Sequence, residues 1–298
     1  MNDLTTKRLA VIKQLYLQGV NQSYEVEPIN GFSILSFHDS VEMFMKLCAE
    51  QKGIRIDRHT NFSDYFSKIP DLKGGSPMVS LNSRRVSLKH SGLLPSKLDI
   101  EISRRNTMDF FEENTPIFFG KRFGEISLIS LIKYPSVCEY LEDSQVAINE
   151  NKYEEAIKIS QVAFKELLHC HHEENSKDFL NPFSEVKSFT FHKSFFIKPE
   201  IGKRFDKFVD DVSLSIPRLE EAVKIIGFGI DYRQYCKFRL FTPIICVEYV
   251  NDERQYSVGA SDGRLIFNLQ NARFCFDFVV LSALKLQEFC VDLKNTIK

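Results

Sequence analysis

The feature that most constrains how this chain folds is a wide apolar stripe in residues 31–51. Apolar side chains recur there three and four positions apart, which is the spacing of one face of an α-helix. These side chains are Ile34, Leu35, Phe37, Val41, Phe44, Met45 and Cys48. The stretch therefore predicts a helix that is buried along one broad face.

Three further helices are predicted in the first half of the chain. Proline lacks the N–H that the first helical position leaves unpaired, and glycine often ends a helix, so Ser76-Pro77 and Gly92 bound one of them. Ser96 is a suitable N-cap for another. The expected helices cover residues 3–19, 76–91 and 97 to about 114.

The second half shows the same helical spacing with a short β segment. Four helices are expected, at residues 137–148, 153–172, about 204–226 with Pro217 as a candidate break, and 272–293. Residues 243–250 predict a buried strand, with residues 264–269 as its partner across a hairpin that contains Gly259 and Gly263. Residues 175–202 predict irregular structure in which Phe189, Phe191, Phe195 and Phe196 press on the core.

These patterns predict a mainly α protein of two parts. At 298 residues the chain is near the size at which single cores divide. We expect a helical bundle in residues 1–133 and a second mainly helical region with a small sheet in residues 134–298. The amphipathic helical pair in the second region suggests a degenerate copy of the first bundle.

Composition limits the functional classes. The net charge of −1 gives no overall basic field, so any contact with RNA must be local. No apolar run approaches the length of a membrane span, and the first residues lack the apolar region of a signal peptide. Seven cysteines without a Cys-x-x-Cys pair are typical of reduced thiols. We therefore expect a cytoplasmic protein without a membrane segment.

A cationic cluster and a histidine coincide at the end of the helix predicted for residues 76–91. Arg84 and Arg85 are followed by Lys89 and His90, and Gly92 stops the helix. The negative end of the helix dipole favours a protonated histidine. Because histidine titrates near neutral pH, His90 is a candidate for proton transfer.

The Arg-x4-His spacing of Arg85 and His90, with Lys-His-x-Gly at its end, resembles the HEPN superfamily of helical-bundle proteins. The family pattern allows four to six intervening residues, so Arg84 also fits. The family usually has a polar residue after the arginine, whereas Val86 follows Arg85, and the choice between the two arginines stays open. The resemblance implies metal-independent RNA cleavage at a site where two bundles meet, hence a homodimer.

Helix geometry separates the two motif residues. Five steps of about 100° place His90 roughly 140° around the helix from Arg85, whereas Arg85 and Lys89 share a face. The site therefore requires that the helix distorts or ends before His90, or that a second copy of the chain supplies the other half.

Two further groups of polar residues are candidates for supporting roles. The segment 37–43 resembles the acid-bearing second helix of HEPN bundles, so Asp39 or Glu42 orients Arg85 or His90, or else both are solvated acids. His38 is expected to be a packing or surface residue. Arg104 and Arg105 extend the basic surface towards RNA, or are ordinary surface charges.

Metal and cofactor sites are not expected. In the run from His169 to Glu174, adjacent helical residues diverge, so two ligands at most converge there. The glycine-rich residues 73–77 lack the lysine-Ser/Thr ending of a phosphate-binding loop.

Two functions remain. In the first, the protein is an endoribonuclease with His90 as general acid or base and Arg85, helped by Arg84 and Lys89, stabilising the transition state. The resemblance implies a toxin-like or antiviral setting with an activating or neutralising partner. In the second, the bundle is a non-catalytic scaffold for protein interaction.

Overall fold

The computed structural model describes residues 2–57, 59–174, 199–250, 253–259 and 265–288. These residues form helices and a two-stranded sheet, so the predicted fold class, mainly helical with a small sheet, is confirmed. The chain divides into two compact units, residues 1–131 and 132–298, where the sequence predicted a boundary between 133 and 134. No helix within the described ranges is long and apolar enough to cross a membrane.

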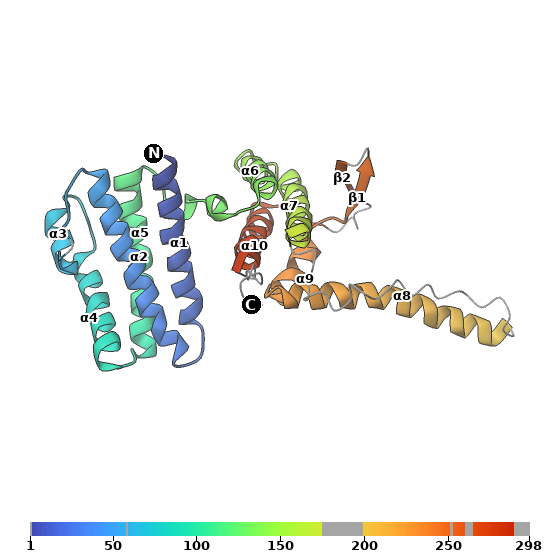
Figure 1. Ribbon diagram of the computed structural model, residues 1–298, viewed down its shortest axis with the longest axis horizontal. Coiled ribbons are helices and arrows are strands. Elements are labelled where there is room, and N and C mark those ends of the chain that lie inside the picture. The colour runs from blue at the N-terminus through green and yellow to red at the C-terminus, as the bar shows by residue number, and fades with distance from the viewer. Residues whose placement is uncertain (1, 58, 175–198, 251–252, 260–264, 289–298) are drawn as a thin grey trace, which may run out of the picture. The chain divides into compact units, whose positions relative to one another are not determined.

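The N-terminal unit is a helical bundle organised around α2 (Figure 1). Helix α2 contacts α1, α4 and α5, and α5 also contacts α1 and α4. The elements of the N-terminal unit are α1 (Asp3–Ser23), α2 (Ile29–Gln51), the short helices η1 (Phe62–Asp64) and α3 (Tyr65–Lys68), α4 (Gly75–Ser91), α5 (Lys97–Phe119), and the single turns η2 (Phe123–Glu125) and η3 (Ile129–Leu131).

The apolar stripe of α2 forms the centre of this unit. Phe37, Val41 and Phe44 are completely buried. The Phe44 ring lies 5.3 Å from that of Phe111 on α5, and Phe111 stacks on Phe123 at 4.3 Å. Burying one such side chain contributes about 1.5–3 kcal/mol. The stripe therefore fixes the relative positions of α2 and α5.

The predicted signals at the start of α5 are present, but its end differs. Ser96 Oγ accepts a hydrogen bond from the backbone N–H of Asp99, whose carboxylate accepts one from the N–H of Ser96. The helix runs beyond the predicted end at Asn114 and through Pro116, stopping at the left-handed Gly120 (φ 68°). Proline has a helical φ, so it removes one hydrogen bond without ending the helix.

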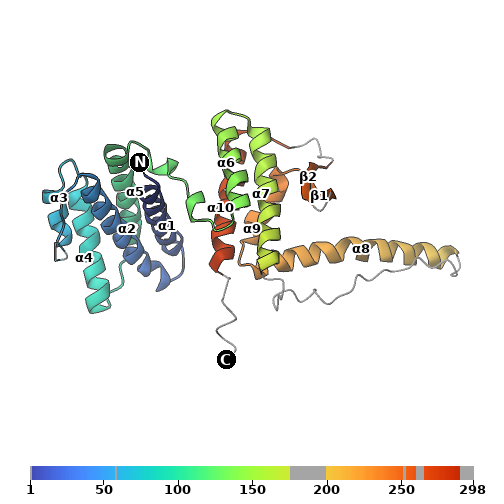
Figure 2. The same ribbon diagram turned by 45° about the horizontal axis from the view of Figure 1, so that its top comes forward.

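The C-terminal unit is built on the helical pair that the sequence predicted. Helix α7 contacts both α6 and α10, and the three lie side by side (Figure 2). The elements of the C-terminal unit are α6 (Pro135–Asn149), α7 (Tyr153–Glu174), α8 (Pro199–Gly227), α9 (Tyr232–Phe241), β1 (Ile245–Val250), β2 (Glu253–Val258) and α10 (Leu269–Glu288). Whether this unit is a copy of the first stays a hypothesis.

The predicted strand pairing is wrong. Strand β1 pairs antiparallel with β2, in a register that joins Val250 to Glu253, and not with residues 264–269. Of that range, the described residues 265–268 lie outside helix and strand, and Leu269 begins α10. The sequence argument favoured an apolar partner, whereas β2 is a polar strand that uses Arg254 and Tyr256 to bind a buried carboxylate of α7.

Other elements also differ from the prediction, and α1 continues past its expected end at Gly19 to Ser23. Helix α9 was not expected because it is short and rich in polar residues; Tyr235 and Phe238 nevertheless bury their rings on its inner face. Helix α8 continues through Pro217 and begins at Pro199, so residues 199–202 are helical rather than irregular. The four phenylalanines predicted to press on the core at 189–196, and the predicted end of the last helix at 289–293, lie outside the described residues.

Candidate active site

The motif residues lie on α4, a helix bounded by glycine at both ends. Gly74 and Gly92 adopt left-handed conformations with φ of 81° and 67°, which residues other than glycine rarely adopt. Between them α4 is helical from Gly75 to Ser91. The helix therefore neither distorts nor ends before His90, so the condition for a site within a single copy is not met.

Arg85 and His90 consequently point in different directions. Arg85 is half-buried and His90 is exposed. Neither makes a hydrogen bond or an ion pair with another residue that the structure describes. Five steps along an unbroken helix separate their directions by roughly 140°. The structure does not bring the predicted pair together within one chain.

Arg84, the other candidate arginine, is held by an ion pair. Its Nε donates to Asp99 Oδ1 at 2.9 Å. The same carboxylate accepts hydrogen bonds from Ser96 Oγ at 2.6 Å and from the Ser96 N–H. The hydrogen bonds from Ser96 and Arg84 lower the pKa of Asp99 below its ordinary value. Arg84 thus joins α4 to the start of α5. Of the two candidate arginines, Arg85 is the one that binds no acid among the described residues.

Arg85 instead lies close to the acid-bearing face of α2. Burial lowers the pKa of His38, and the positive charge of Arg85 lowers it further. For Glu42, burial disfavours the ionised form, but the hydrogen bond from Lys46 and the positive charges of Lys46 and Arg85 act against burial, and the pKa is lowered. The charge of Arg85 therefore acts on Glu42 of α2, while the proposed orienting role of Asp39 and Glu42 stays a hypothesis.

His38 is buried and packed, in agreement with one of the two roles predicted for it. Its Nε2 lies 3.0 Å from Asn82 Oδ1 on α4, and its Nδ1 lies 3.3 Å from Asp39 Oδ1. The ring stacks on Phe62 with 4.6 Å between centroids. The sequence did not reveal that this histidine connects α2, α4 and η1.

The other predicted cations occupy separate positions. Lys89 is exposed and shares the face of Arg85 on α4. The guanidinium of Arg104 lies 4.6 Å from the centre of the Tyr24 ring, a geometry that favours cation–π attraction. Arg105 is exposed. Of the two arginines on α5, Arg105 is thus the one whose charge is more open to solvent.

The histidine run at the end of α7 does not form a three-ligand group among the described residues. His171 is buried, with Nδ1 3.5 Å from the Tyr134 hydroxyl, while His172 is exposed. Neighbouring residues of the run therefore diverge, as helix geometry predicted.

A buried carboxylate of the C-terminal unit was missed by the sequence analysis. Glu166 on α7 accepts hydrogen bonds from Arg254 at 2.8 Å, Tyr256 at 2.5 Å and Ser136 at 2.8 Å, and from the thiol of Cys170 at 3.3 Å. Burial raises its pKa, but these hydrogen bonds and the charge of Arg254 prevail and lower it. Both carboxylate oxygens of Glu166 accept hydrogen bonds within the protein, so this residue joins α7 to α6 and β2.

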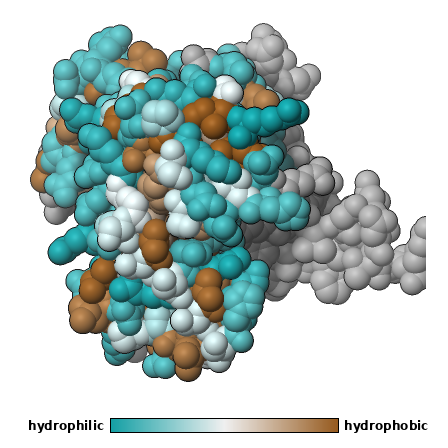
Figure 3. All heavy atoms as spheres, turned by 90° about the vertical axis from the view of Figure 1, so that its left-hand side faces the viewer, coloured by the Kyte–Doolittle hydropathy of each residue, from teal (hydrophilic) through white to brown (hydrophobic). Residues whose placement is uncertain are grey.

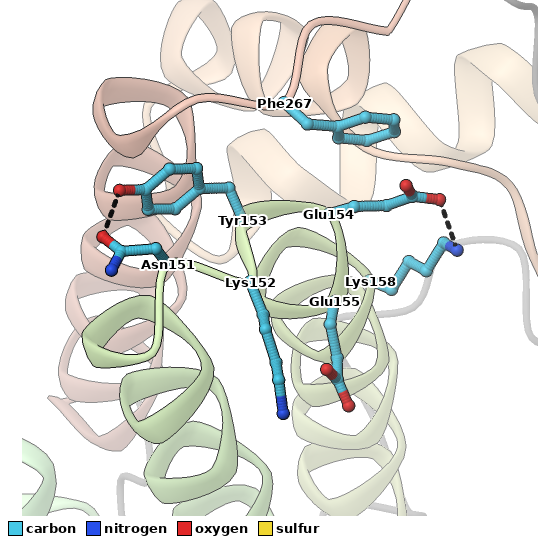
Figure 4. Close-up of a pocket in the computed structure, with 7 residues that line it drawn as sticks. All are labelled: Asn151, Lys152, Tyr153, Glu154, Glu155, Lys158 and Phe267. Carbon is cyan, nitrogen blue, oxygen red and sulfur yellow. Dashed lines mark hydrogen bonds and ion pairs between the residues drawn. The ribbon is translucent and has the colours of Figure 1, made fainter.

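A shallow pocket of about 610 Å³ lies at the start of α7. Figure 4 shows Tyr153 turned towards Asn151, and Glu154 extended towards Lys158 beside Phe267. These pairs are a hydrogen bond of 2.6 Å and an ion pair of 2.7 Å. Lys152 pairs with Glu150 outside the pocket lining, so most of the polar groups that line this pocket are engaged with other side chains.

No family model, no curated protein and no solved structure matches this chain. The functional assignment therefore depends on the chemistry of the residues themselves.

Proposed function

We propose that the protein is a metal-independent endoribonuclease whose chemistry is carried by Arg85 and His90 of α4. The observation that supports this best is the contrast between neighbouring arginines. Arg84 is bound to Asp99, whereas Arg85, Lys89 and His90 make no ion pair or hydrogen bond with the residues that the structure describes and are half-buried or exposed. A cationic helix end of this kind is open to a phosphate.

In the proposed reaction His90 accepts the proton of a ribose 2′-OH as the oxygen attacks the adjacent phosphorus. The P–O5′ bond breaks, solvent water protonates the leaving oxygen, and the products are a 2′,3′-cyclic phosphate and a 5′-OH. Arg85 binds the phosphoryl oxygens, where charge builds up in the transition state. Lys89 adds positive charge on the same face, and Arg105 contacts the RNA backbone.

We further propose that two copies complete the site. Because α4 is unbroken, the Arg85 of one copy acts with the His90 of another. Figure 3 shows the side of the N-terminal unit that carries α3 and α4, where hydrophilic side chains dominate and hydrophobic ones lie in small separate patches. Such a surface suits a polar interface, in which the acids Asp39 and Glu42 offset the opposing cations.

RNA cleavage by purified protein in EDTA tests this function. His90→Ala and Arg85→Ala are each expected to lower the cleavage rate by about 10² to 10⁴. Thermal stability should stay within about 1 kcal/mol of wild type, because neither side chain is fully buried and neither makes a hydrogen bond or ion pair with the described residues. Arg55→Ala, an exposed arginine outside α4, is the control and should cleave normally.

Two further variants distinguish the arginines. Arg85→Lys keeps the charge but removes the planar fork that binds two phosphate oxygens, so cleavage should fall. Arg84→Met should leave cleavage intact, since the role of Arg84 is to bind Asp99. Wild-type cleavage by both His90→Ala and Arg85→Lys would exclude this motif as the active site.

A scaffold without catalysis is the second candidate, favoured by the divergence of Arg85 and His90 on an unbroken helix. A protein that cleaves no RNA, alone or with candidate activators, would support the scaffold.

In the enzymatic proposal, by contrast, the protein works in the cytoplasm as a toxin or antiviral effector, and a partner protein activates or neutralises it.

A further inference from the structure

Three side chains of α2 place atoms that bind transition metals around one small space. One ligand atom each from His38, Asp39 and Glu42 lies within 4.8 Å of the other two. His38 Nδ1 is 3.3 Å from Asp39 Oδ1 and 4.0 Å from Glu42 Oε2. Zinc bonds of about 2.0–2.2 Å imply neighbouring ligands about 3.3–3.5 Å apart. Small rotations of the two carboxylates would complete this geometry.

The buried imidazole makes this group different from an ordinary acidic surface. Its side chain is 3% exposed. Nε2 faces Asn82 Oδ1 at 3.0 Å, and the tautomer that carries its proton on Nε2 donates to that oxygen. In that tautomer Nδ1 directs its lone pair towards the carboxylates of Asp39 and Glu42. A cation between them would accept this lone pair.

The surroundings of His38 are those of a metal-binding histidine. Such a histidine usually donates its second N–H to an oxygen, which fixes the ring and makes the free nitrogen a better ligand. Asn82 supplies that oxygen, and the stacked Phe62 ring holds the imidazole plane. The carboxylates of Asp39 and Glu42 are 58% and 33% exposed, so an ion reaches them from solvent.

Two positively charged side chains disfavour the binding of a metal ion at this site. Lys46 on α2 bonds Glu42 at 2.6 Å, and Arg85 on α4 exerts its charge on both His38 and Glu42. Lys46 is 49% exposed, so it can turn into solvent when a divalent ion takes its place. The charge of Arg85 remains and weakens binding relative to a site without a neighbouring cation.

We propose that His38, Asp39 and Glu42 form a binding site for a divalent cation of the zinc type, with water in the remaining positions. The imidazole ligand favours zinc, cobalt and nickel over magnesium and calcium. The site shares no ligand with the proposed chemistry of Arg85 and His90, which needs no metal ion and therefore proceeds in EDTA.

Cobalt titration of the purified full chain, freed of metal by a chelator and dialysis, tests the site. One equivalent of Co²⁺ is expected to give a saturable visible absorption of a four- or five-coordinate ion, which Zn²⁺ abolishes and Mg²⁺ leaves unchanged. Zn²⁺ should also raise the thermal midpoint, because a ligand that binds the folded state stabilises it.

Substitutions locate the ion. Asp39→Asn and Glu42→Gln keep side-chain size at partly exposed positions and should each weaken Co²⁺ binding at least tenfold. The double variant His169→Asn, His172→Asn removes the other histidine-rich segment and should bind as wild type does. The proposal is overturned if Co²⁺ gives no such absorption, if both carboxylate variants bind normally, or if the histidine-run variant loses the ion.

Discussion

Glu166 offers the sharpest test of how the C-terminal unit is held together. Replacement by glutamine keeps the size of the side chain but removes its charge and converts one acceptor into a donor. Arg254, whose side chain is only 18% exposed, then loses its counter-charge. Tyr256 and Ser136 lose an ionised acceptor. Removing one partner of a buried ion pair costs about 3–5 kcal/mol, and this is the destabilisation expected for Glu166→Gln.

Urea denaturation followed by circular dichroism, with hydrogen exchange of the β2 amides, measures the effect. The matched control is Glu155→Gln, an exposed acid on the same helix, which should change stability by less than about 0.5 kcal/mol. Glu166→Gln, Arg254→Met should recover most of the loss, because no buried charge is then left unpaired. A Glu166→Gln protein that is as stable as wild type, with its β2 amides equally protected from hydrogen exchange, would refute the proposed structural role of Glu166.

Three further outcomes are expected. Because the folded-state pKa of Glu166 is lowered, its contribution is present above the unfolded value near about 4.3 and is lost as pH falls through the folded pKa. The stability difference between wild type and Glu166→Gln should therefore shrink below about pH 4. Light scattering should show a dimer that tightens as salt screens the opposing Arg85 and Lys89 side chains, and a monomer at all salt concentrations would contradict this. Arg84→Met should lower stability by less than about 1 kcal/mol in urea, since Asp99 is 39% exposed.

Much of the fold could be predicted because helical spacing and terminal signals are local. The stripe of α2, the Ser96 cap and the stop at Gly92 depend only on nearby residues, and the structure shows all three. Strand pairing is not local. The partner of β1 is chosen by contacts of Arg254 and Tyr256 with a helix almost ninety residues earlier in the chain, which no spacing rule reveals.

The candidate site could be predicted only in part for the same reason. The sequence marked Arg85, His90 and the acids of α2, yet it left the choice of arginine open. Only the position of Asp99 against α4 shows that Arg84 is engaged. The burial of His38 depends on Asn82 and Phe62, which are distant in sequence, so the sequence left open whether this histidine is packed or lies at the surface.

Mixing two inactive variants measures the central claim most directly. If Arg85 of one copy acts with His90 of another, a heterodimer of Arg85→Ala and His90→Ala contains one intact site and one doubly altered site. After subunit exchange of equal amounts, half of the dimers are heterodimers, so about one quarter of wild-type RNA cleavage should return in EDTA. Each variant alone should stay inactive. A mixture as inactive as its components, although light scattering shows that heterodimers form, would contradict a site shared between two copies.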